Sequence, residues 1–207
     1  MKAASESRPS TGRKLNVWLL KFSRHWLRGV LIIIGLYAGL PYAAPVMMKV
    51  GLTAPARVLY TLYSPMCHQM AFRSMFFFGD QLFYPRAIAG TEMTPFEAYA
   101  AQLPEFASVN LQGFDVGLIF AARDFVGNDQ MGYKMTLCAR DTAIYTFLFL
   151  GGLIYSIPYV RRRIRPVPIW LYIFLGLGPI GIDGVSQLLS YPPFSLSPVR
   201  ETAPFFR

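Results

Sequence analysis

The stretch GVLIIIGLYAGLPYAAPVMM, residues 29–48, decides the class of this protein. It contains no charged residue, and twenty helical residues at about 1.5 Å each reach across the roughly 30 Å hydrocarbon core of a bilayer. Seven Lys and Arg residues precede it, and basic residues flanking a span favour the cytoplasmic side. We therefore expect an integral membrane protein with a cytoplasmic N-terminus. An uncleaved anchor is favoured over a signal peptide, because the apolar core is too long and Pro45 follows Ala43-Ala44, where cleavage would fall.

Composition supports a membrane class and argues against nucleic-acid binding. Hydrophobic residues make up 54% of the 207 residues and charged residues only 15%. The net charge of +9 comes from clusters beside apolar segments: seven basic residues lie before residue 29, and four more are Arg161, Arg162, Arg163 and Arg165. Such clusters are typical of positive-inside loops. The expected partner is the lipid bilayer.

Three spans are expected, at residues 29–48, 142–160 and 167–189. If the first runs outward, the second returns to the Arg161 cluster and the third runs outward again. The expected division is a basic cytoplasmic segment (1–28), an anchor (29–48), an extracytoplasmic insert (51–140), a transmembrane hairpin (141–189) and an extracytoplasmic tail (190–207).

The insert carries helix signals of its own. Thr94-Pro95-Phe96-Glu97 has the pattern of a capping box with proline at the first helical position, so a short helix should follow. Residues 114–125 form a second apolar-periodic run. Residues 58–71 lack Lys, Arg, Asp and Glu but reach only about 21 Å as a helix, too short to span. They predict an interfacial or re-entrant helix broken at Pro65; a full span is the alternative and would invert the topology downstream.

The sequence thus predicts an all-α integral membrane protein with about three transmembrane helices, an interfacial or re-entrant helix and a small helical extracytoplasmic lid. Its polar residues should gather at the outer membrane boundary. Asp183 lies sixteen residues, or about 24 Å, beyond Val167, near the depth at which the second span begins. The group comprises Cys67, His68, Gln69, Arg73, Cys138, Arg140, Asp141, Tyr145, Asp183 and Gln187.

Asp183 is the most informative member, because an ionisable side chain within a span costs about 2.5–3.5 kcal/mol and needs a partner. Arg140 and Arg73 are the candidate partners, and Gln187 shares its helix face. Three interpretations of Asp183 are open: it forms an ion pair that fixes the last span, it belongs to a proton or ion path, or it is part of a metal or cofactor site.

Cys67 and Cys138 also leave three alternatives open: a disulfide, two inert buried thiols or a metal site. Together with His68 and Asp141 they would supply two thiolates, an imidazole and a carboxylate, a donor set suited to a transition metal such as zinc or iron.

At these same residues the chain resembles a family of small prokaryotic membrane proteins catalogued as a domain of unknown function. The shared elements are Cys67-His68-Gln69 with Arg73-Ser74, Cys138-Ala-Arg140 with Tyr145, and Pro179 with Asp183-Gly184 and Gln187. The resemblance covers roughly residues 60–200 and implies the plasma membrane of a prokaryote. Many relatives have a second cysteine where this chain has Asp141, and relatives continue into another hydrophobic helix after a segment like residues 200–204. We therefore expect that the last span is lost or that this sequence is truncated.

Two functions follow as hypotheses. The first is a non-catalytic accessory subunit of a membrane complex, in which Gly35, Gly39 and an aromatic belt at residues 76–84 pack on partner proteins. The alternative is a membrane protein that binds a metal ion or redox cofactor through the cluster of Cys67, His68, Cys138 and Asp141.

Overall fold

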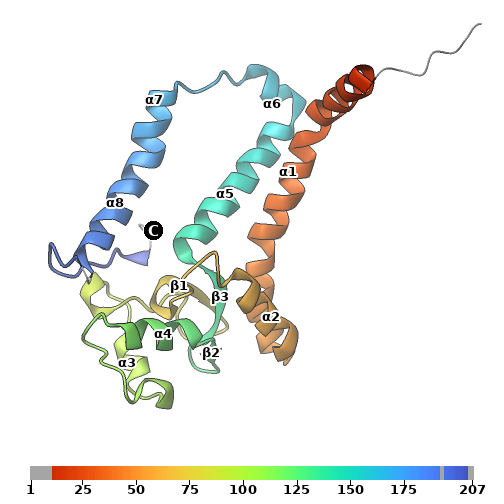
Figure 1. Ribbon diagram of the computed structural model, residues 1–207. Helices are drawn as coiled ribbons and strands as arrows, with labels where there is room; N and C mark the ends of the chain where they lie inside the picture. The colour runs from red at the N-terminus through yellow and green to blue at the C-terminus, as the bar shows by residue number, and fades with distance from the viewer. Residues whose placement is uncertain (1–10, 192–193, 205–207) are drawn as a thin grey trace, which may run out of the picture.

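The computed structural model describes residues 11–191 and 194–204. Lys2 and Arg8, two of the seven basic residues before residue 29, and Pro192-Pro193 in the tail lie outside the described residues. The fold consists of long helices that converge at one end on a small folded domain, which we call the insert (residues 51–140) (Figure 1). The helical columns are α1 (Thr11–Lys49), α5 (Ala139–Ser156) and the consecutive α7 (Ile169–Leu171) and α8 (Gly178–Ser190).

Within the described residues, two helices are long and apolar enough to cross a membrane, His25–Lys49 and Ile169–Ser190. They correspond to the first and third predicted spans. The second predicted span forms α5, which has 18 residues and carries Arg140 and Asp141 in its first turn. These two charges lower its apolar character, so α5 is not among the candidate spans.

Proline shapes both candidate spans. Pro41 lies inside α1 and has no N–H to donate to the carbonyl of Tyr37. That carbonyl instead accepts the Tyr63 hydroxyl at 2.9 Å, which ties α2 (Thr53–Tyr63) to α1. In the other span a π-helical stretch, η4 (Tyr172–Leu177), lies directly before Pro179, where the regular hydrogen-bond ladder is interrupted.

Helices α1 and α5 pack closely because glycine lets them approach. A Cβ on Gly35 would lie 2.8 Å from Cε2 of Phe149, and one on Gly152 would lie 2.6 Å from Cδ2 of Leu31. Gly35, which we expected to face a partner protein, is therefore already covered by α5 of its own chain.

The chain is mostly helical, as expected, but it is not all-α, because the insert contains a three-stranded antiparallel sheet in the order β1-β3-β2. Its strands are β1 (Ser74–Phe77), β2 (Gly127–Asn128) and β3 (Gly132–Cys138). The hairpin between β2 and β3 depends on Gly132 at φ +75°, where a Cβ would lie 2.2 Å from the carbonyl oxygen of Phe77. Asn128 Oδ1 accepts the N–H groups of Gln130 and Met131 and completes the turn. A two-residue strand such as β2 leaves almost no periodic signal in the sequence.

Short helices and an aromatic core complete the insert. Phe76, Phe96 and Phe106 are buried there, and Tyr84 donates its hydroxyl to the Met131 carbonyl at 3.1 Å. The residues taken for an interfacial aromatic belt thus lie partly in a folded core. The short helices are α3 (Phe96–Ala100), α4 (Val116–Asp124), η1 (Ala71–Arg73), η2 (Ala87–Ala89) and η3 (Pro104–Phe106).

The helix predicted after Thr94 exists as α3, but its N-cap is Pro95 and it has no side-chain cap. The Glu97 carboxylate instead lies 2.9 Å from Arg86 Nε and accepts the Ala87 N–H at 3.0 Å. Helix α2 ends at Tyr63, two residues before Pro65, and its 11 residues are too few to cross a bilayer.

After α5 the chain forms α6 (Pro158–Arg163), whose last turn carries Arg161, Arg162 and Arg163. It then runs to α7, and both α6 and α7 lie at the opposite end of the molecule from the insert (Figure 1). The C-terminal end of α1, the N-terminal end of α5 and the C-terminal end of α8 all point toward the insert (Figure 1).

Candidate functional site

A cavity of about 580 Å³ lies between the insert, the start of α5 and the last turns of α8. It is the place where the polar residues selected from the sequence meet. Eight of them line it: Cys67, His68, Gln69, Arg73, Cys138, Arg140, Asp141 and Gln187. Asp183 is joined to this wall through Arg140, whereas Tyr145 packs edge-on against the ring of Tyr37, with centroids 4.5 Å apart.

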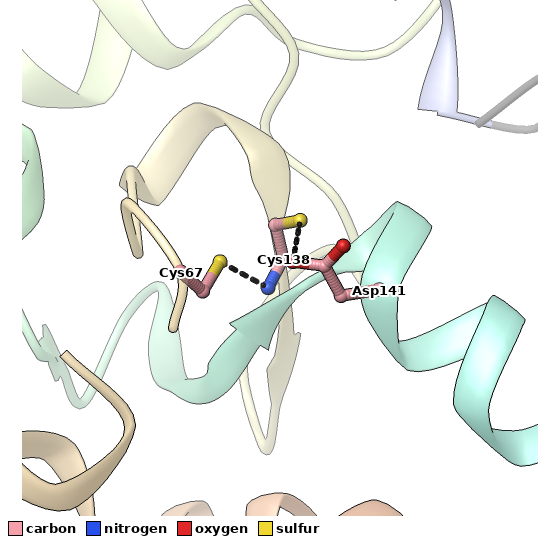
Figure 2. A group of neighbouring side chains, drawn as sticks. All are labelled: Cys67, Cys138 and Asp141. Atoms are coloured by element: carbon pink, nitrogen blue, oxygen red, sulfur yellow. Dashed lines mark hydrogen bonds between the residues drawn. The ribbon is translucent and has the colours of Figure 1, made fainter. Parts of the chain in front are cut away.

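Two thiols and a carboxylate form the centre of the site (Figure 2). Cys67 lies in the irregular segment after α2, Cys138 is the last residue of β3, and Asp141 is in the first turn of α5. Cys67 Sγ, Cys138 Sγ and an Asp141 oxygen all lie within 4.8 Å of one another. The Cys138 N–H donates to Cys67 Sγ at 3.2 Å, and the Cys138 thiol donates to Asp141 Oδ2 at 3.0 Å. Both cysteines are free thiols.

The two thiols differ in their electrostatics. Interaction with the Cys138 side chain, together with backbone N–H groups that include that of Cys138, lowers the pKa of Cys67 and outweighs the burial that would raise it. The same interaction, together with burial and the Asp141 carboxylate, raises the pKa of Cys138. A single negative charge on the pair is therefore carried by Cys67, while Cys138 keeps its proton.

Lys134 fixes the segment that carries Cys67 and His68. It is fully buried in β3, and its Nζ donates to the carbonyl of Gln69 at 2.7 Å and to carbonyls at the end of α4. Burial lowers the pKa of Lys134 to about 7. Gln69 has φ +52°, and its side-chain amide donates to the Tyr60 carbonyl at 3.0 Å. The left-handed turn after His68 is thus held by hydrogen bonds on both sides.

The C-terminal tail closes the site on its α8 side. Asp183 accepts hydrogen bonds from Arg140, from Arg200 at 3.1 Å and from the Thr202 hydroxyl at 2.6 Å. Gln187 Nε2 donates to the same Thr202 hydroxyl at 2.6 Å. Arg140 is therefore the partner of Asp183, as one of the two sequence alternatives proposed.

The other alternative, Arg73, binds a different carboxylate. Its guanidinium lies 2.6 Å from Glu201 Oε1, donates to the Tyr191 hydroxyl and sits within 6 Å of the rings of Phe114 and Tyr191. These two rings stack with centroids 4.0 Å apart.

Sequence reasoning missed Lys134, Tyr191, Glu201 and Thr202. A lone lysine in the apolar run GYKMTLC was the available signal for Lys134. Tyr191 lies before the prolines at 192, 193 and 198, and Glu201 and Thr202 lie after them; prolines disfavour a helix but do not specify where the chain goes.

Among the described residues, two candidate spanning helices end near a polar site and a small folded domain, an arrangement typical of helical membrane proteins. Residues 130–203 match a protein family described as "Predicted membrane protein (DUF2085)". A 59-residue stretch is 36% identical to the uncharacterized protein MJ1492 of Methanocaldococcus jannaschii and covers 28% of this chain and 36% of that protein. The chain thus spans about a third of the length of this curated relative. No solved structure matches. The comparisons confirm the expected resemblance to an uncharacterised family of membrane proteins.

The matched region includes Cys138 and Asp141, two of the three residues at the centre of the site. Cys138, Arg140, Asp141, Asp183 and Gln187 lie within residues 130–203, whereas Cys67 and His68 lie before them.

Proposed function

We propose that this membrane protein binds a transition metal ion of the zinc type through Cys67 Sγ, Cys138 Sγ and the Asp141 carboxylate. One observation carries the proposal: these three donor atoms lie within 4.8 Å of one another on the wall of a cavity. Tetrahedral zinc with Zn–S bonds of about 2.3 Å needs sulfurs about 3.8 Å apart. Side-chain shifts of roughly 1 Å therefore suffice to form the metal bonds.

The donor chemistry favours a divalent ion. Metal ligands must be deprotonated, and the lowered pKa of Cys67 makes its thiolate accessible. Cys67 and Cys138 as thiolates, together with the Asp141 carboxylate, would hold the ion. His68 is adjacent to Cys67 and lines the same cavity, so its imidazole is the candidate fourth ligand.

The surrounding polar residues serve in this proposal as a structural clasp. Arg140 and Gln187 join α8 to the wall of the site, through Asp183 and Thr202 respectively. Arg73 and Gln69 hold the opposite wall through Glu201 and Tyr60, and Tyr145 packs between α5 and α1.

The topology proposed with this function is a multi-pass protein of a prokaryotic plasma membrane. It has three spans formed by α1, α5 and the α7–α8 helix, a cytoplasmic N-terminus and an extracytoplasmic insert. Its support is the separation of charge: the arginines of α6 lie at the far end of the helices from the insert (Figure 1). Helix α5 is about 27 Å long, close to the hydrocarbon thickness.

An accessory role in a membrane complex is the second candidate. The observation that favours it is the α7–α8 helix, because the most apolar stretch of this helix is 0% buried inside the chain. Copurification of a stable partner chain, lost when bulky residues are introduced along that helix, would support it.

Elemental analysis of the purified full chain tests the metal site. We expect about one metal ion per chain after zinc loading, and loss of the ion in Cys67→Ser and Cys138→Ser. Asp141→Asn should weaken binding, whereas Asp129→Asn, a carboxylate 90% exposed near Lys49, is the matched control and should not. Substoichiometric metal in the unchanged chain, or full retention in both cysteine variants, would overturn the proposal.

A further inference from the structure

We infer that, when no metal is bound, the site carries out thiol–disulfide exchange with a small or peptide disulfide. In this reaction Cys67 is the attacking thiol, Cys138 the resolving thiol and Asp141 the proton acceptor. The inference uses the same three side chains as the proposed metal site but does not depend on metal binding.

The two sulfurs are close enough to join after limited movement. They lie within 4.8 Å, and a disulfide bond is about 2.05 Å long, so an approach of under about 3 Å closes it. Cys67 is outside regular secondary structure, and Cys138 is at the junction between β3 and α5. Neither side chain lies in the interior of a helix, so regular helix geometry does not fix the position of either sulfur.

The hydrogen bonds give the two thiols different roles. Figure 2 shows Cys67 Sγ directed at the backbone nitrogen of Cys138, which donates to it at 3.2 Å. A donor aimed at sulfur stabilises negative charge on it, as an attacking thiolate requires. Cys138 has the opposite arrangement, since its thiol donates to Asp141 Oδ2 at 3.0 Å. The carboxylate is therefore positioned to take the Cys138 proton.

The cavity offers a route for a disulfide substrate to Cys67, which is buried, and to Cys138, which is half-buried. Cys67 and Cys138 line the cavity of about 580 Å³, a volume within the range of small-molecule sites. Met66, Phe114 and Leu188 give this cavity an apolar wall, and His68 and Arg73 supply polar groups. That mixture suits a peptide or a small organic disulfide.

The reaction balances without another reagent. The Cys67 thiolate attacks one sulfur of R–S–S–R′, which forms a Cys67–S–S–R bond and releases R′S⁻. Asp141 then accepts the Cys138 proton, and the Cys138 sulfur attacks Cys67 Sγ and expels RS⁻. The two protons lost by the cysteines end on the released thiols, so the chain is oxidised by two electrons and the substrate is reduced by two.

The test uses the full chain in detergent with a chelator and oxidised glutathione, followed by intact mass. The unchanged chain should lose two hydrogens and hold no stable adduct. Cys138→Ala should accumulate one glutathione on Cys67, whereas Cys67→Ala should form an adduct at least about ten times more slowly. Equal rates for the two variants would overturn the assigned roles.

Asp141→Asn separates resolution from attack. It should leave the first adduct forming at nearly its normal rate but make that adduct persist, while the matched Asp129→Asn should behave as the unchanged chain does. A time course on the unchanged chain, quenched with acid and mapped by peptide mass, needs no variant to fold. A first adduct on Cys138 in that time course would refute the scheme.

Zinc loading distinguishes this inference from the proposed function. If the chain binds zinc but its chelated form does not react with oxidised glutathione, the exchange activity is absent and the metal site stands. If the chelated chain reacts but never retains zinc, the exchange activity stands alone.

Discussion

The insert and the α7–α8 helix are attached to the rest of the molecule by different forces. The insert buries aromatic side chains such as Phe76 and Phe96 in a core of its own. The most apolar stretch of the α7–α8 helix is not buried against the rest of the chain. This helix is connected at its C-terminal end, through Asp183, Gln187 and the tail that follows α8. Apolar burial drives association in water but not in lipid, where polar contacts and close packing hold helices together. The difference fits a molecule with one part in water and the other in a bilayer.

The largest expected effect comes from emptying the core of the insert. Phe76 is 1% exposed, so Phe76→Ala should lower the free energy of unfolding of the insert by about 3–5 kcal/mol. Phe78, two residues away and 50% exposed, provides the control, since Phe78→Ala should cost under about 1 kcal/mol. Hydrogen exchange of the β3 amides measures both. Similar costs for the two variants would mean that the insert has no apolar core of its own.

A smaller effect is expected from breaking the polar attachment of α8. Asp183→Asn removes the charge that Arg140 and Arg200 share and should cost about 1–3 kcal/mol. The loss should be confined to faster hydrogen exchange in α8 and the tail, with the β3 amides unchanged. Asp129→Asn, whose partner lies 3.8 Å away at the surface, should leave both regions unaffected. Faster exchange throughout the insert would contradict the independence of the two regions.

The same contrast explains what sequence could predict. Helix rise predicted that Arg140 and Asp183 would lie at similar heights on their helices, and the structure brings them together. In the insert, residue number does not predict where a residue lies, because turns change the direction of the chain every few residues. The sheet was therefore missed, since its strands are short and β1 and β3 are more than fifty residues apart.

The polar partners outside the spans were missed for a related reason. The role of Lys134 depends on a tertiary contact, since its Nζ donates to the carbonyl of Gln69, 65 positions earlier in the chain. Glu201 and Thr202 reach their partners because the tail reverses direction after Tyr191, and prolines alone do not specify where a chain returns.

Lys134 supplies a pH test within the insert. Its pKa is lowered from an ordinary value of 10.5 to about 7 by burial, so the unfolded chain binds more protons than the folded chain between these values. The stability of the insert should therefore rise with pH from about 7 toward 10.5, by at most about 1.4 kcal/mol per unit. Lys134→Met removes this dependence, so the difference in unfolding free energy between the two chains should change across that range. A difference independent of pH would show that Lys134 titrates normally.

The smallest effect concerns the open face of α8. A Cβ on Gly181 would meet nothing within 4 Å, so Gly181→Ala should stabilise the helix by about 0.5–1 kcal/mol through its higher helix propensity. Gly35→Ala is the matched opposite, because its Cβ would lie 2.8 Å from Phe149 and force that ring to move. The thermal midpoint of each purified variant measures the contrast. If Gly181→Ala instead destabilises the chain or releases a copurifying protein, close packing against this glycine is required, and the open face of α8 is an interface, not a lipid-facing surface.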